Sequence, residues 1–300
     1  MKNLLVEKCL LKCLEPGLSE HKIEYSVFED ISEVYSFPES EYLVVGPQTK
    51  LVASEFEAMP KLKKVLVAGG GVDNIDEAVA EDKNIERRCF VANGPSTTEL
   101  TIYFLIHLAK ELHKGRVKFE SDDWNNFPGF GHDLYGKTLG LVGFGYIGKS
   151  VAGVAQALQV NVIAHDPYVQ DHDFEKTNVS KVELDVLLEN SDFVSLHIPY
   201  KRKLVKFFNK EKFKKMKLGS CLVNTSRGQI IDENDLLEAL GDGRPKFCAL
   251  DVFCDEPLPA DSPFMDHPQV LSTPHIAGRT IDSQSRMGEM LLKNILQLFE

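Results

Sequence analysis

Residues 140–148 read GLVGFGYIG, and this stretch predicts the fold of the chain around it. The short apolar run at 138–142 predicts a buried strand, and 146–158 has the periodicity of a helix. Gly143, Gly145 and Gly148 therefore stand at a strand-to-helix turn in the order G-x-G-x-x-G. In such a turn the first glycine permits the tight bend, the second lets the backbone approach a pyrophosphate, and the third lets helix and strand pack closely.

An acidic residue completes this pattern. A second predicted strand, 161–164, is followed by Asp166, which lies 18 residues after Gly148. A carboxylate there accepts hydrogen bonds from the adenosine ribose, while the helix N-terminus attracts the phosphates. Asp166 would repel a 2′-phosphate, and neither His165 nor Tyr168 offers a guanidinium to offset that, so we predict NAD as the cofactor. An ordinary glycine-rich turn is the alternative.

Composition narrows the class of protein. Three hundred residues suggest two domains of roughly 150 residues each. A hydrophobic content of 43% suffices for a globular core. The net charge of −11, with the basic run at 210–217 interpreted as a solvated helix face, disfavours a nucleic-acid partner. The longest apolar stretch, 102–109, is too short for a bilayer and contains His107.

The six cysteines form no C-x-x-C pair, so we interpret them as reduced core thiols and predict neither a disulfide frame nor a metal site. Cys9 and Cys13 have the spacing of a metal pair, but no further Cys or His is near them in sequence. Charged residues at Glu7, Lys8 and Lys12 argue against a signal peptide, so we expect a cytoplasmic protein.

The N-terminal third alternates strand-like runs (22–28, 42–45, 64–68) with more polar helical stretches, which predicts an α/β unit with a parallel sheet. The glycines at 69–71 leave backbone N–H groups open to an anion such as a carboxylate, although a plain tight turn explains them equally well. Residues 93–96 are interpreted as a linker before a helix that reaches Leu112, and 120–135 as a loop.

The remaining chain repeats the β-α pattern, which predicts an open, doubly wound sheet. Asp232 is placed to cap a helix that runs to Leu240. The amphipathic stretch 281–300 is expected to cross back to the first domain, giving a substrate domain of 1–92 plus 279–300 and a nucleotide domain of 93–278. The other expected elements are a helix at 182–189 and strands at 193–197, 221–224, 247–252 and 270–272.

Three polar residues follow predicted strands and suit the oxidation of a hydroxy acid. Arg227 offers a planar fork for a carboxylate and a donor for the reacting oxygen. His275 is a general acid or base suited to neutral pH, and Glu256 can hold one imidazole nitrogen. Each residue alone also has an ordinary structural explanation: an arginine on the surface, a histidine hydrogen-bonded within the fold, or an acid that caps a helix.

Together these stretches resemble the D-isomer-specific 2-hydroxyacid dehydrogenases over nearly the whole chain. The motifs that carry the resemblance, in chain order, are GGGVDNID at 69–76, GKTLG at 136–140, LHIP at 196–199, NTSRG at 224–228, LDVF at 250–253, DEP at 255–257 and TPHIAG at 273–278.

The resemblance implies a Rossmann-type domain with a smaller flavodoxin-like α/β substrate domain, and an NAD-dependent enzyme that interconverts a small D-2-hydroxy acid and its 2-keto acid. It implies that Arg227, Glu256 and His275 are catalytic, and that Gly70, Gly71 and Asn93, with Arg227, bind substrate. It implies a homodimer joined through the nucleotide domain, with 95–135 as an arm. The implied dinucleotide site comprises Gly143, Gly145, Tyr146, Ile147, Gly148, Asp166, Ile198, Thr225, Asp251, His275, Ala277 and Gly278.

The chain departs from the family pattern near Gly46, where phosphoglycerate-oxidising members often carry an arginine and this sequence has none. We therefore favour an uncharged substrate substituent over 3-phosphoglycerate. The chain also stops at Glu300, without the short tail that often follows the last helix in the family. Two further alternatives keep the fold: oxidation of formate or phosphite, and a cofactor-dependent corepressor without enzymatic activity.

Overall fold

The computed structural model describes residues 3–112 and 131–299, and it divides the chain into two compact units. Unit 1 comprises Met1–Asn93 and Arg279–Glu300, and unit 2 comprises Gly94–Gly278. The division places Asn93 in unit 1, one residue away from the boundary predicted from the sequence.

Unit 1 contains a five-stranded parallel sheet in the order β2-β1-β3-β4-β5. This 2-1-3-4-5 order is that of flavodoxin-like folds. Its elements are β1 (Leu4–Glu7), α1 (Leu11–Glu20), β2 (Tyr25–Phe28), β3 (Tyr42–Val45), α2 (Ala53–Ala58), β4 (Lys64–Val67), α3 (Glu77–Asp82), β5 (Glu86–Cys89) and α10 (Ile281–Phe299).

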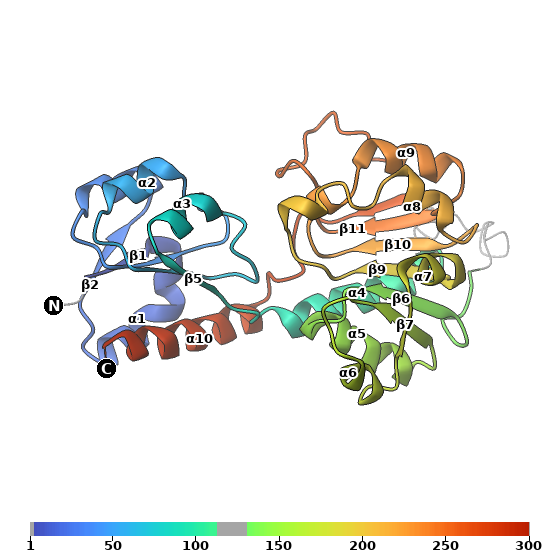
Figure 1. The fold of residues 1–300 in the computed structure, drawn as a ribbon, viewed down its shortest axis with the longest axis horizontal. Coiled ribbons are helices and arrows are strands. Elements are labelled where there is room, and N and C mark those ends of the chain that lie inside the picture. The colour runs from blue at the N-terminus through green and yellow to red at the C-terminus, as the bar shows by residue number, and fades with distance from the viewer. Residues whose placement is uncertain (1–2, 113–130, 300) are drawn as a thin grey trace, which may run out of the picture. The chain divides into compact units, whose positions relative to one another are not determined.

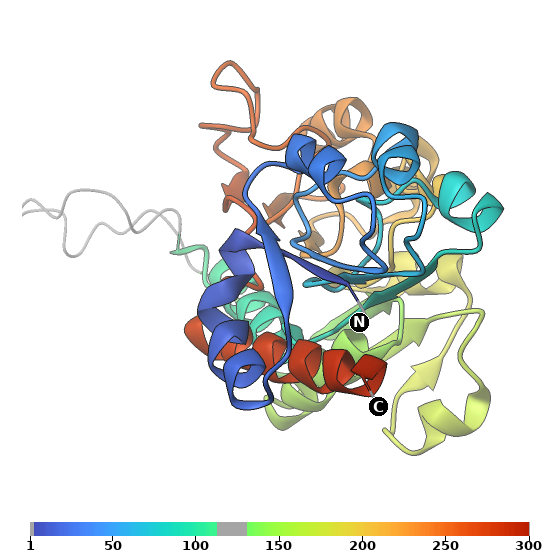
Figure 2. The same cartoon turned by 90° about the vertical axis from the view of Figure 1, so that its left-hand side faces the viewer.

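Helices cover both faces of this sheet (Figure 1), with α2 and α3 on one face and α1 and α10 on the other. Figure 2 shows α1 and α10 side by side. Met287, Leu291 and Ile295 recur every fourth residue along α10 and are buried against the sheet. Each such side chain stabilises the fold by roughly 1.5–3 kcal/mol relative to an exposed one, which explains why the last helix belongs to the first unit.

Unit 2 contains a seven-stranded parallel sheet in the order β12-β11-β10-β9-β6-β7-β8. Counted within the unit this is 3-2-1-4-5-6 with one more strand at the end, the dinucleotide-binding order. Its strands are β6 (Thr138–Val142), β7 (Asn161–His165), β8 (Ser180–Lys181), β9 (Phe193–Leu196), β10 (Cys221–Asn224), β11 (Phe247–Leu250) and β12 (Val270–Ser272).

The helices of unit 2 pack on both faces of its sheet, so the fold is doubly wound (Figure 1). One face carries α4, α5 and α6, and the other carries α7, α8 and α9. Their bounds are α4 (Gly94–Ala109), α5 (Tyr146–Ala157), α6 (Asp171–Glu175), α7 (Leu184–Asn190), α8 (Lys210–Lys215) and α9 (Glu233–Gly241).

Some sequence predictions were wrong. The proposed linker at 93–96 is largely the first turn of α4, which begins at Gly94; a proline is tolerated there because first-turn N–H groups have no helical partner. Cys221 and Cys248 are buried, but Cys9 is exposed, so the cysteines are not all core thiols. The predicted loop at 120–135 and arm at 95–135 lie partly outside the described residues. In the part of the chain that the structure describes, no helix has the length and apolar character needed to cross a bilayer.

Candidate active site

The glycine turn between β6 and α5 lies where the strand order of unit 2 reverses, between β9 and β7. Gly143 has φ +97°, and a Cβ there would lie 2.4 Å from the carbonyl oxygen of His197. A Cβ at Gly148 would lie 2.4 Å from the Gly143 oxygen. Among the described residues, its chain neighbours aside, a Cβ at Gly145 would meet no atom within 4 Å. The chain itself therefore requires glycine at 143 and 148, whereas Gly145 leaves space that a bound phosphate can use.

Asp166 follows β7 and helps to shape this turn. Its Oδ2 accepts a hydrogen bond from the backbone N–H of Phe144 at 2.9 Å, and its Oδ1 accepts one from the N–H of Tyr168 at 2.9 Å. Each carboxylate oxygen has a second acceptor position, so the residue can also accept from ribose hydroxyls. The glycines, the start of α5 and Asp166 thus fit the diphosphate and ribose of a dinucleotide.

The other predicted dinucleotide residues surround the turn or follow neighbouring strands. Tyr146 and Ile147 open α5, and the Tyr146 ring packs on Gly94. Ile198 follows β9 with its side chain against Gly143. Thr225 follows β10, is buried and lies 3.0 Å, oxygen to oxygen, from Thr101. Ala277 is buried and Gly278 is partly buried at the end of unit 2.

The carboxylate of Asp251, which was predicted as a cofactor contact, binds the chain around His275. Asp251 is fully buried after β11, and its carboxylate accepts hydrogen bonds from Thr273 Oγ1 at 2.5 Å, Ile276 N at 2.8 Å and Ala277 N at 2.9 Å. The backbone N–H of His275 also donates to the Asp251 carbonyl at 2.9 Å. These bonds hold His275 at φ +51°, a conformation that a non-glycine residue rarely adopts without such support.

His275 and Glu256 are hydrogen-bonded to each other. Nδ1 of His275 lies 2.6 Å from Oε2 of Glu256, and Oε1 of Glu256 accepts from the backbone N–H of Phe253 at 3.0 Å. Partial burial raises the pKa of the Glu256 carboxyl, but the bonds from His275 and Phe253 and the charge of Arg227 outweigh it, so the pKa lies below its usual value. Glu256 is therefore ionised, Nδ1 carries the hydrogen, and Nε2 is left to exchange a proton.

Arg227 belongs to the same constellation because two loops are packed together. The buried Asn224 side chain accepts from Ser226 N at 3.0 Å and donates to the Arg227 carbonyl at 3.0 Å, which fixes the turn after β10. Gly228 has no room for a Cβ, which would lie 1.9 Å from the Phe253 carbonyl carbon. The turn of Arg227 is thus locked against the loop that carries Glu256. Asn224 was quoted in the NTSRG motif but was given no role, although an Asn at a buried strand end is a signal for such a turn.

The predicted substrate residues Gly70, Gly71 and Asn93 lie in unit 1. Gly70 is exposed after β4, and a Cβ there would lie 3.5 Å from Oδ1 of Asn93. That Oδ1 is buried and has no hydrogen-bond partner among the described residues. Asn74 donates to the carbonyls of Gly46 and Thr49 at 3.2 and 2.7 Å, so the loops after β3 and β4 are joined.

Sequence analysis also missed Glu7, at the end of β1. Its Oε2 accepts from the Gly46 N–H at 2.7 Å and from Thr49 Oγ1 at 2.8 Å. A carboxylate therefore lies at the position where the family resemblance led us to look for a cation. Only the parallel pairing of β1 with β3 brings the two together, since they are 39 residues apart in sequence.

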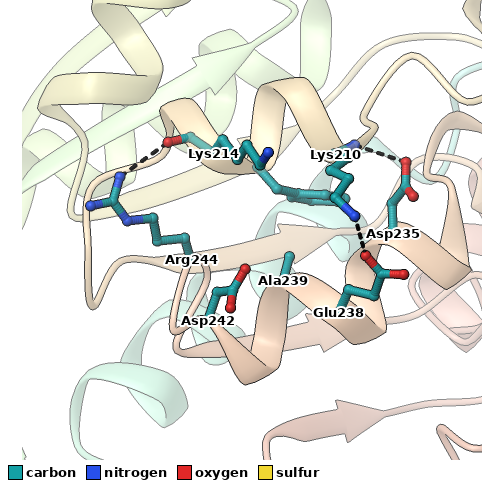
Figure 3. A pocket seen from close by; sticks show the side chains of 8 residues that line it. Lys210, Lys214, Asp235, Glu238, Ala239, Asp242 and Arg244 are labelled. Atoms are coloured by element: carbon teal, nitrogen blue, oxygen red, sulfur yellow. Dashed lines mark hydrogen bonds and ion pairs between the residues drawn. The ribbon is translucent and has the colours of Figure 1, made fainter.

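A small cavity of about 30 Å³ lies between α8 and α9 (Figure 3). Its charges bind one another: Lys210 pairs with Glu238 at 2.5 Å, and Arg244 donates to the Lys214 carbonyl at 3.1 Å. We assign it no ligand. Within residues 3–112 and 131–299, no group of three or more Cys, His, Asp or Glu residues is arranged to hold a metal ion.

Comparison with known proteins places this geometry in a family. A family model described as "D-isomer specific 2-hydroxyacid dehydrogenase, NAD binding domain" matches residues 102–277. The hydroxypyruvate reductase of Thermotoga maritima is 38% identical over 264 residues, which cover 87% of this chain and 85% of that protein. The D-3-phosphoglycerate dehydrogenase of Archaeoglobus fulgidus is 35% identical over 266 residues, 87% of this chain but 50% of that protein. The chain thus spans about half the length of such relatives.

A solved structure has the same fold over nearly the whole chain. The D-lactate dehydrogenase of Aquifex aeolicus, complexed with NAD and lactic acid, superposes with a TM-score of 0.86 at 26% identity, covering 99% of this chain and 95% of that one.

Proposed function

This chain belongs to the D-isomer-specific 2-hydroxyacid dehydrogenase family, and from that premise we propose that it reduces a small 2-keto acid to the D-2-hydroxy acid with NADH. The observation that carries the proposal is the constellation of Arg227, Glu256 and His275, held by the three loops that follow β10, β11 and β12 in unit 2. The cofactor, when bound, supplies the hydride that the carbonyl carbon receives.

Three side chains bind the substrate and supply the proton. The planar fork of Arg227 binds the substrate carboxylate and polarises the keto oxygen. Nε2 of the protonated His275 donates its proton to that oxygen, so the carbonyl gains one hydride and one proton. Ionised Glu256 accepts from Nδ1–H and stabilises the imidazolium before the proton leaves.

We further propose that Gly70, Gly71 and Asn93 bind the substrate. Exposed Gly70 leaves backbone N–H groups open to a carboxylate. Oδ1 of Asn93 has no partner among the described residues and is a buried acceptor, so it can accept a hydrogen bond from the hydroxyl of the 2-hydroxy acid.

The substrate substituent is proposed to be small and uncharged, as in glyoxylate, hydroxypyruvate or a short aliphatic 2-keto acid. A buried phosphate needs a cationic fork to offset its desolvation. Beside Gly46 the chain instead presents the carboxylate of Glu7. In this respect the chain differs from what a phosphorylated substrate requires, although D-3-phosphoglycerate dehydrogenases are among the proteins it matches.

A panel of 2-keto acids tests the proposal, with the loss of NADH absorbance as readout and 3-phosphoglycerate with NAD as comparison. We expect turnover of at least one small keto acid and poor oxidation of 3-phosphoglycerate. Efficient 3-phosphoglycerate oxidation would contradict the substrate class. NADH binding without turnover of any keto acid would favour the corepressor-like alternative.

We also propose a cytoplasmic homodimer. Free thiols at all six cysteines suit a reducing compartment.

Unit 2 exposes apolar side chains on adjacent α4 and α5, with Tyr103 48%, Ile106 37%, Val154 41% and Leu158 41% exposed, and a second copy would bury them. Ile106→Glu with Val154→Glu should give monomers by sedimentation, whereas Val186→Glu on the opposite face should not. Monomers of the unmodified chain would contradict this surface.

A further inference from the structure

The first turn of α4 contacts two parts of unit 2 that the cofactor has to connect. A Cβ at Gly94 would lie 2.1 Å from the ring of Tyr146, which opens α5 beside the phosphate-binding glycines. One turn further on, the hydroxyl of Thr101 lies 3.0 Å from that of Thr225, which follows β10 two residues before Arg227. A dinucleotide whose phosphates lie at the glycine turn must reach the substrate held by Arg227, so its nicotinamide half passes the start of α4.

Thr97, in this part of α4, has a hydroxyl that the protein leaves unbonded. Two other threonines use theirs inside the helix: Thr98 Oγ1 donates to the Gly94 carbonyl at 2.9 Å, and Thr101 Oγ1 donates to the Thr97 carbonyl at 2.8 Å. Thr97 is 1% exposed, and its Oγ1 makes no hydrogen bond with any of the described residues. Because a buried hydroxyl without a partner destabilises a fold, such an atom indicates a ligand that supplies the missing bond.

The position of Thr97 along the helix indicates which part of the cofactor it meets. At about 1.5 Å per residue, Thr97 lies about 4.5 Å along the axis from Gly94 and about 6 Å from Thr101. It therefore stands between the pyrophosphate end of the path and the loop of Arg227, where the nicotinamide riboside fits. The hydrogen-bonding group of the nicotinamide ring is its carboxamide, and a threonine hydroxyl can donate to the carboxamide oxygen or accept from the nitrogen.

We propose that the hydroxyl of Thr97 hydrogen-bonds the carboxamide of the bound nicotinamide and orients the ring for hydride transfer. The inference rests on the proposed function, in which the ring delivers its hydride to a keto carbon. A hydrogen bond to the carboxamide restricts rotation of the ring about its bond to the ribose, so that one face of the ring stays turned towards the substrate.

Binding measurements with two ligands test the contact. Calorimetry gives the Kd of NADH and the Kd of ADP-ribose, which has the terminal ribose but no nicotinamide ring. Thr97→Val removes the hydroxyl and keeps the shape, so it should raise the Kd of NADH about three- to tenfold and change that of ADP-ribose less than about twofold. Thr97→Ser keeps the hydroxyl and should bind NADH within about twofold of wild type.

The melting temperature of the chain without cofactor distinguishes a binding role from a structural one. Thr97→Val removes a buried hydroxyl that has no partner among the described residues, so the melting temperature should equal or exceed that of wild type. The matched control is Thr98→Val, because the Thr98 hydroxyl is bonded within the helix. This control should leave both Kd values within about twofold of wild type.

The inference would be overturned by an unchanged Kd of NADH in Thr97→Val, or by an equal rise for NADH and ADP-ribose. A loss of NADH affinity that Thr98→Val shares, or that accompanies a fall in the melting temperature, would overturn it too. These measurements need no keto acid. If the Kd values change as expected but no keto acid is reduced, the contact stands and the proposed function fails. If a keto acid is reduced and Thr97→Val binds NADH like wild type, only this inference fails.

Discussion

Oε2 of Glu256 lies 2.6 Å from Nδ1 of His275, while the other oxygen of the same carboxylate is held by the backbone of Phe253. The carboxylate is thus fixed at both oxygens and orients the imidazole, so that Nε2 is the nitrogen left for a substrate. Asp251 supports the arrangement: its carbonyl accepts from the backbone N–H of His275, and its carboxylate accepts from the N–H groups of Ile276 and Ala277.

Removing the imidazole should abolish proton transfer and little else. His275→Asn is the better variant, because asparagine tolerates the φ of +51° at this position more readily than alanine. We expect kcat for keto-acid reduction to fall about 10²–10⁴-fold, with the NADH Kd and the melting temperature close to wild type. Turnover near the wild-type value would exclude His275 as the acid.

Glu256→Gln should move the pH profile in one direction. Keto-acid reduction needs the imidazolium, and this variant removes the anion that stabilises it. The alkaline limb of reduction and the acid limb of the reverse oxidation should therefore both move to lower pH. The comparison is Glu233→Gln, which alters a carboxylate bound to the adjacent Cys254 N–H. Limbs that stay in place, or move upward, in Glu256→Gln would refute the pairing role.

Gly145→Ala should weaken NADH binding without destabilising the fold. Apart from its chain neighbours, a methyl group there meets no atom of the described residues within 4 Å, so the melting temperature should stay close to wild type, but the methyl group occupies the space assigned to the pyrophosphate. We expect the NADH Kd to rise about tenfold or more. Gly153→Ala on α5, which is equally unobstructed, is the control and should leave the Kd unchanged. Equal NADH affinity in both variants would place the pyrophosphate elsewhere.

His197 should make the fold sensitive to acid. Desolvation lowers the pKa of this imidazole from 6.5 to about 4, so it is neutral in the folded chain. Between these values the unfolded chain binds a proton that the folded chain does not, and the free energy of unfolding should fall as the pH drops from 6.5 towards 4. His197→Gln should reduce this slope in urea titrations at several pH values, and His172→Gln, an exposed control, should not. An undiminished slope in His197→Gln would show that other groups cause the acid sensitivity.

The sequence predicted the parts of this fold that depend on local patterns. The glycine turn, the strand at 221–224 and the cap at Asp232 were found because their signals lie within a few residues. Shorter or less periodic elements were not predicted from the sequence. The strands β5 (Glu86–Cys89, ERRC) and β8 (Ser180–Lys181, SK) are polar and largely exposed, and they are strands because they pair with β4 and β7, not because of their own composition.

Contacts across the sheets could not be predicted for a related reason. Glu7 meets Gly46 only through the pairing of β1 with β3, and Lys203 meets Tyr168 only because β6 lies between β9 and β7. Strand order is a property of the whole unit, and no short motif encodes it. The catalytic assignments came from the family resemblance, and the structure adds the hydrogen bonds that make them chemically reasonable.

The most direct test of the central claim follows the hydride itself. The keto acid with the highest kcat/KM in the panel, if it yields a chiral product, is reduced with NADH carrying deuterium at the transferring C4 position. The account predicts one deuterium at C2 of the product, which has the D configuration, and formation of this labelled product about 10²–10⁴-fold more slowly in His275→Asn. An unlabelled product, or an L-hydroxy acid, would contradict the account.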